Sequence, residues 1–190
     1  MPQRATDSGI ASESPSSARL RQDDQVLIVR ATKKLLQRLD PPTLQQGQHS
    51  TTLLGGWYAT ALFWKPQVVL LVNEATLLPV LMPLAPARTA PARIGQQIAA
   101  VLAAHRTPTA IIDDERQQMR DCRISNTANR SVVGVMTEFT RLAEVYRGAG
   151  TSQDLLALAM RLATTPCGPL YDRNISPDRE LQAFLRSIAN

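Results

Sequence analysis

The stretch WYATALFWKPQVVLLVNEATLLPVLMP, residues 57–83, decides the fold that the sequence predicts. WYATALFW alternates imperfectly between apolar and other side chains, and QVVLLVN (67–73) is a continuous apolar run of strand length. The break at Lys65-Pro66 between these two runs indicates an antiparallel hairpin. In the third run, Pro79 and Pro83 lack backbone N–H donors, so we expect that strand to lie at an edge of the sheet or to be irregular.

Upstream of this stretch, VLIVRA (26–31) is a β-branched run that predicts the first strand. TKKLLQRLD then predicts a short helix with Thr32 as its cap and with three inward leucines, Leu35, Leu36 and Leu39. PPTLQQGQHSTT predicts a loop. Residues 1–24 are rich in Ser, Pro and charge without any hydrophobic period, which is typical of a disordered leader.

Downstream, the 3.6-residue apolar period predicts helices at Thr89–His105, Thr107–Met119, Ser131–Tyr146, about Thr151 onward, and from Ser176 to the end. Thr107 and Thr151 are the predicted caps, Thr151 forming a capping box with Asp154. Pro108 is expected at the first helical position, and Gly148 and Gly150 at a helix end. DCRISNT predicts one further strand.

This order of elements predicts a single α+β domain with a mostly antiparallel sheet packed by helices. We expect three segments: a leader (1–24), an α+β core (25–148), and a helical C-terminal extension packed on the core (149–190).

The formal net charge is +5, but the basic residues are scattered, as on an ordinary solvated surface, although arginines also leave a polyanionic partner open. No apolar run reaches the length that crosses a membrane, and no apolar core of a signal peptide is present. The two cysteines have no metal or disulfide spacing. We therefore expect a cytoplasmic protein that uses no metal, no cofactor and no membrane.

Strong catalytic motifs for nucleotide binding, metalloproteases and hydrolases are missing from the sequence. His49 and His105 stand alone, without a second group to orient either ring. Asp113, Asp114 and Glu115 are adjacent, and because successive residues diverge around a helix axis, we interpret them as a solvated face.

Three polar patches remain as weak candidates for ligand binding. They are Lys33 with Lys34 after the first strand, Asn73 with Glu74 after the apolar run, and Asn126, Asn129, Arg130 and Ser131 before the fourth predicted helix. Each has a structural alternative: a cap with solvated charges, a turn, and a helix cap, respectively. The helix dipole opposes Arg130 near a helix N-terminus, so either a carboxylate such as Glu74 or a bound phosphate must compensate it.

Four segments, ATKKLL, LLGGWYATAL, LLVNEATLLPVLMP and TANRSVVGVMTEF, in this order and spacing, resemble a bacterial domain family known only as a domain of unknown function. The resemblance runs from about Val26 to Tyr146, with a tail similar to that family's C-terminal extension. It implies a fold and a bacterial cytoplasmic setting, and it implies no activity. This chain departs from the usual residues at Gly56 (Asp), Thr60 (Asn), Val135 (Ser) and Thr137 (Asn).

The leading hypothesis is a non-enzymatic binding domain whose polar rim recognises a nucleotide, single-stranded nucleic acid or a protein partner. Lys33, Lys34 and Arg130 would contact phosphate, and Trp57 or Tyr58 would stack on a base, although core packing is the alternative for that pair. The rival hypothesis is a small enzyme acting on nucleotides or nucleic acid, with Glu74 as general base and Lys33 and Arg130 stabilising charge. A third hypothesis is a structural partner that docks through its C-terminal helices.

Overall fold

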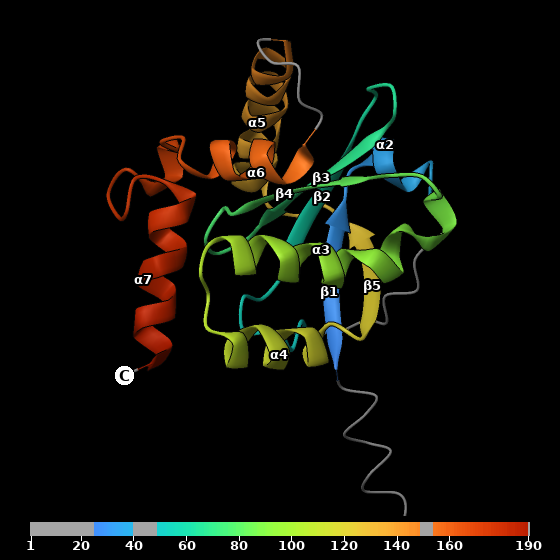
Figure 1. Cartoon of the computed structure of the whole chain (residues 1–190). Helices are drawn as coiled ribbons and strands as arrows, with labels where there is room; N and C mark the ends of the chain where they lie inside the picture. Colours follow the sequence, from blue (N-terminus) through green and yellow to red (C-terminus); the bar gives the residue numbers. More distant parts are fainter. Residues whose placement is uncertain (1–24, 40–48, 149–153, 190) are drawn as a thin grey trace, which may run out of the picture.

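The computed structural model describes residues 25–39, 49–148 and 154–189 (Figure 1). The predicted leader, most of the predicted loop before residue 52, and the predicted roles of Gly150 and Thr151 lie outside these residues.

A five-stranded sheet forms the centre of the fold, in the order β4-β3-β2-β1-β5. Its strands are β1 (Val26–Ala31), β2 (Trp57–Leu62), β3 (Val68–Asn73), β4 (Pro79–Pro83) and β5 (Asp121–Asn126). β2, β3 and β4 are consecutive antiparallel neighbours, which confirms the predicted hairpin. β4, with its two prolines, is an edge strand, as the missing N–H donors require.

β1 is parallel to both of its neighbours, β2 and β5. The antiparallel ladders pair six and five residues, and the parallel ladders pair three and six, so the sheet is mostly antiparallel, as predicted. All strands except β3 run in one direction. The parallel half arises because α2 connects β1 to β2, while α3 and α4 carry the chain from one edge strand to the other.

Helices cover both faces of the sheet. They are α2 (Lys33–Leu36), α3 (Ala90–Ala104), α4 (Thr109–Gln118), α5 (Arg130–Gly148), α6 (Leu155–Ala163) and α7 (Pro177–Ala189), with 3-10 turns η1 (Ala87–Thr89) and η2 (Gly168–Leu170). Figure 1 shows α3 and α4 in front of the sheet and α5 behind it, and α3 contacts β4 and β5 while α5 contacts β2 and β3.

One continuous core of mostly aliphatic residues joins these layers. It includes Phe139 of α5, Ile98 of α3, Leu162 of α6 and Leu181 of α7, all fully buried. Because the two last helices bury side chains in the same core as the sheet, the described chain is one α+β domain with a helical C-terminal part, as predicted.

The predicted helix caps are partly wrong. The hydroxyl of Thr32 makes no cap and instead shares a 2.9 Å hydrogen bond with the hydroxyl of Thr60 on β2. α4 begins at Thr109, so Pro108 precedes the helix and Thr107 does not cap it. Asp154 itself caps α6, accepting hydrogen bonds from the Leu156 and Ala157 amides. In each case a tertiary contact or a shift of the helix start replaces the local motif that the sequence favours.

Glu115 is not part of a solvated face. Asp113 and Asp114 are exposed, whereas Glu115 is only 1% exposed. Its carboxylate accepts hydrogen bonds from the backbone amides of Leu53 (2.7 Å) and Leu54 (3.2 Å), which tie the segment before β2 to α4. The helical period predicts which way this side chain points, but it does not predict that a loop from a distant part of the chain covers it.

Candidate functional site

Three polar side chains from three other parts of the chain meet around the carboxylate of Glu74. We call Arg30, Tyr58, Glu74 and Asn129 the Glu74 cluster. Glu74 Oε1 accepts hydrogen bonds from the Tyr58 hydroxyl (3.3 Å) and from Asn129 Nδ2 (3.4 Å), and Arg30 Nη1 lies 3.4 Å from Glu74 Oε2. The backbone amide of Asn129 donates to the Tyr58 hydroxyl at 3.0 Å. The cluster therefore closes as a network between β1, β2, the end of β3 and the start of α5.

The sheet register brings these groups together. Arg30 and Tyr58 are paired across β1 and β2, so their side chains lie on the same face of the sheet. Glu74 follows β3, and its backbone amide donates to Gly56 O at 3.0 Å. A Cβ on Gly56 would lie 3.0 Å from Arg30 Nη1 and 3.1 Å from Glu74 Oε2. The missing side chain therefore leaves the space in which Arg30 and Glu74 meet.

The electrostatics favour a structural network over a reactive one. Burial, followed by the nearby Glu74 carboxylate, raises the pKa of the Tyr58 phenol, which stays a neutral hydrogen-bond donor. Arg30, Tyr58 and Asn129 donate to the two oxygens of Glu74 at 3.3–3.4 Å and join this partly exposed carboxylate to the network.

The patch before α5 serves mainly as a helix cap. The side-chain oxygen of Asn129 accepts hydrogen bonds from the amides of Ser131 (3.0 Å) and Val132 (3.4 Å). With these amides satisfied, the helix start presents few free donors to a phosphate. Arg130 and Ser131 are exposed, and the carboxylate of Glu74 pairs with Arg30, a residue that the sequence did not single out.

Asn73 is fully buried, and all of its side-chain polar groups are used within the fold. Its Nδ2 donates to Leu54 O (2.8 Å) and Gly56 O (3.3 Å), and its Oδ1 accepts from Ala75 N, Thr76 N and the Thr76 hydroxyl. Asn73 therefore holds the turn after β3 against the loop before β2, and no polar atom of it is left for a ligand.

Trp57 and Tyr58 are 0% and 1% exposed, so neither ring offers a face to a base. Trp57 and Tyr58 therefore belong to the packed core, which is the structural alternative to base stacking. Of the remaining predicted site residues, Asn126 is exposed at the end of β5, and Lys33 and Lys34 are exposed on α2. The contacts of the described residues join Glu74 to Asn129, but none joins Lys33 or Lys34 to them.

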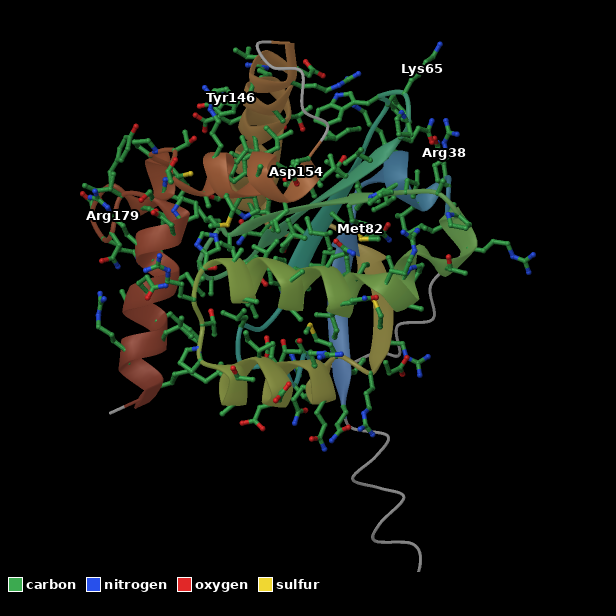
Figure 2. All side chains as sticks on the ribbon, viewed as in Figure 1. Arg38, Lys65, Met82, Tyr146, Asp154 and Arg179 are labelled. Carbon is green, nitrogen blue, oxygen red and sulfur yellow. The ribbon has the colours of Figure 1, made fainter. Side chains whose placement is uncertain are left out.

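A second surface, which the sequence did not predict, lies at the tip of the β2–β3 hairpin. The strands are shorter than predicted, so Phe63 and Trp64 fall in the connection rather than in β2. Phe63 is 53% exposed, and the Arg38 guanidinium carbon lies 5.4 Å from its ring centroid. Arg147 stacks over Trp64 in the same way, at 4.9 Å. In the view of Figure 2, Arg38 and Lys65 both lie toward the upper right of the molecule.

We call Lys33, Lys34, Arg38, Phe63 and Lys65 the hairpin-tip surface. All five are exposed, and α2, which carries both predicted lysines, packs against β2. Within this surface Arg38 stacks on the exposed Phe63 ring, and the three lysines are exposed on α2 and on the hairpin connection. Because WYATALFW stays mostly apolar through Trp64, the local pattern does not show that the strand ends at Leu62 and that Phe63 is exposed.

The cavities and titratable groups elsewhere do not add a catalytic constellation. One cavity of ≈ 200 Å³ borders Trp64 and Lys65, and a groove of ≈ 430 Å³ lies beside His105. His49 is exposed. Among residues 25–39, 49–148 and 154–189, no three His, Cys, Asp or Glu side chains gather as a metal site, and no helix is long and apolar enough to cross a membrane.

Comparison with known proteins identifies the family. A family model described as "Domain of unknown function (DUF6933)" matches residues 28–180. The chain belongs to this family. No curated protein and no solved structure matches the chain. The match includes the sheet except the first two residues of β1, the Glu74 cluster, the hairpin-tip surface and the start of α7, so these parts belong to the region that defines the DUF6933 family.

Replacing Tyr58 by phenylalanine tests the Glu74 cluster as a structural network. The change leaves the Asn129 amide without its acceptor and Glu74 without one donor, so we expect a loss of about 1–2 kcal/mol in the free energy of unfolding. Urea denaturation measures this loss. Tyr171→Phe, at a residue that is 64% exposed, is the control and should leave stability unchanged. Equal stabilities of the two variants would show that the network contributes nothing.

Proposed function

We propose that this domain is a non-enzymatic binding module for single-stranded nucleic acid, and that the hairpin-tip surface is its binding site. The observation that carries the proposal is the exposed Phe63 ring with Arg38 over one face and with Lys33, Lys34 and Lys65 on the adjoining segments. Aromatic residues form only 4% of the chain, so an exposed phenylalanine among cations is an unusual use of a scarce residue type.

The chemistry of this surface matches an unpaired strand. Stacking of a base on an aromatic side chain contributes about 1–3 kcal/mol and requires an accessible ring face, which Phe63 has and the buried Trp57 and Tyr58 lack. The exposed lysine and arginine side chains of this surface attract the phosphates of a bound strand. The net charge of +5 supports the approach of a polyanion.

A double helix is a poorer fit to the same surface. The bases of a double helix are already stacked on one another, so their faces are not free to stack on Phe63. The helix at the site, α2, has only 4 residues, which is too short to enter a major groove and read base edges. We therefore assign the surface to single strands.

Catalysis by Glu74 receives no support from the geometry. The hydrogen bonds from Arg30, Tyr58 and Asn129 join the carboxylate of Glu74 to β1, β2 and the start of α5, which is a structural role. Binding without chemistry is the function that these contacts favour.

Fluorescence anisotropy with labelled oligo(dT) and oligo(U) of about 12 nucleotides tests the proposal. We expect the wild type to bind, and log affinity to fall linearly with log salt concentration. Phe63→Ala should weaken binding about tenfold because the stacking contact is lost. The double variant Lys33→Ala/Lys34→Ala should also weaken binding and reduce the salt slope by about 1–2, since each lost phosphate contact removes about 0.7.

Two controls make this experiment decisive. Tyr171→Ala removes another exposed aromatic and should bind as the wild type does. Arg130→Ala removes one exposed cation from the start of α5 and should have little effect. The proposal is wrong if the wild type does not bind, or if Phe63→Ala and Tyr171→Ala bind equally. Loss of binding in Arg130→Ala with retention in Phe63→Ala would instead assign phosphate binding to the start of α5.

A further inference from the structure

A groove of ≈ 430 Å³ lies between the end of α3 and α7, far from the hairpin-tip surface. Among the residues that line it are His105, Arg106, Asp178, Arg179, Gln182 and Arg186. Figure 2 shows Arg179 on one side of the molecule and Arg38 and Lys65 on the other. The groove volume falls within the range of small-molecule sites, which is about 300–1,000 Å³.

Three arginines give this groove a cationic lining. Arg106, Arg179 and Arg186 are exposed, and within the part of the chain that the structure describes none of them forms an ion pair with a carboxylate. Asp178 also lines the groove, and one of its oxygens accepts a hydrogen bond from the Ser176 hydroxyl. Three guanidinium groups against one carboxylate leave a net positive lining, suited to an anion that accepts several hydrogen bonds.

The backbone at the end of α3 is held in a conformation that brings Arg106 to the groove. Arg106 has φ 58, the left-handed conformation in which glycine usually ends a helix. An arginine in this conformation costs free energy that a glycine would not. Gln182 Nε2 on α7 donates to His105 O at 3.0 Å, which fixes the two helices that form the walls.

His105 supplies a buried polar atom without a partner. The residue is 9% exposed, and Nε2 is buried and makes no hydrogen bond within the described residues. Burial lowers the pKa of the imidazole, while nearby Asp178 opposes this effect, so the ring is neutral and holds one N–H donor. Because His105 lines the groove, a ligand bound there would lie beside this unpaired nitrogen.

We propose that this groove binds a small phosphate-bearing molecule, with Arg106, Arg179 and Arg186 holding the phosphate and His105 forming a hydrogen bond to the ligand. The groove site is independent of the proposed nucleic-acid surface and does not rest on it.

Titration of the full chain with inorganic phosphate and with pyrophosphate, followed by calorimetry and by the imidazole proton signals in NMR spectra, tests this site. The wild type should bind, and the signals of His105 should move while those of exposed His49 stay in place. The double variant Arg179→Ala/Arg186→Ala should weaken pyrophosphate binding tenfold or more. Arg88→Ala/Arg116→Ala, which removes two other exposed arginines, should bind as the wild type does.

Two results would contradict the proposed phosphate site. No binding by the wild type excludes a phosphate site, and equal weakening in both double variants means that the overall charge, not the groove, attracts the anion. Phe63→Ala should bind pyrophosphate normally, and the groove variant should bind oligo(dT) normally. Failure of one proposal is thereby distinguished from failure of the other.

Discussion

Asn73→Ala is expected to lower the free energy of unfolding by about 4 kcal/mol, because it breaks a fully buried hydrogen-bond network. The variant leaves the carbonyls of Leu54 and Gly56 without their shared donor, and the amides of Ala75 and Thr76 without their acceptor. Water cannot replace the lost partners easily, since Asn73 is 0% exposed. Urea denaturation at neutral pH measures the change.

The control for this experiment is Asn126→Ala. Asn126 is an asparagine at the end of a strand, as Asn73 is, but it is exposed, and we expect its loss to change stability by less than about 0.5 kcal/mol. Asn73→Asp should be severely destabilising as well, because it replaces the amide donor with an oxygen that faces the Leu54 carbonyl at 2.8 Å. A wild-type-like Asn73→Ala variant would show that the network does not hold the turn.

Glu115→Ala is expected to destabilise the fold by about 2–3 kcal/mol, since it leaves the Leu53 and Leu54 amides without an acceptor. Glu115→Gln keeps a carbonyl oxygen at this position and should cost less. Comparison of the two variants separates the contribution of the hydrogen bonds to stability from that of the negative charge.

Glu115 also predicts a pH dependence of stability. Burial raises its pKa above the ordinary value of 4.5, although the two backbone hydrogen bonds oppose this effect. Between 4.5 and the raised pKa, the folded protein holds a proton that the unfolded chain releases. Raising the pH through this interval therefore favours unfolding, and the contribution of Glu115 to stability falls.

Denaturation curves measured from about pH 4 to pH 8 test this dependence. Glu115→Gln should flatten the fall of stability above pH 4.5, whereas Asp114→Asn, one residue away and exposed, should leave the wild-type slope. An unchanged slope in Glu115→Gln would mean that the buried carboxylate does not titrate in this interval.

Patterns of neighbouring residues predict only part of the candidate site. A helix cap depends on a few consecutive residues, and the structure confirms the prediction that Asn129 caps α5. The partner of Glu74 is not such a property: the sequence offered Arg130 as a candidate, whereas the register of β1 and β2 places Arg30 beside it. Likewise, the same predicted strand contains the buried Tyr58 and the exposed Phe63, and only the end of β2 separates their environments.

The sequence by itself determined the elements, since apolar periods of 2 and 3.6 residues and the placement of prolines act over a few neighbouring residues. It also determined the β2–β3–β4 meander, because short connections allow only adjacent antiparallel pairing. Only the tertiary structure decided that β1 is parallel to β2 and β5, that Glu115 is buried, and that three arginines line one groove with His105. These features depend on contacts between residues far apart in the chain, and no local pattern of side chains specifies which distant partner each will meet.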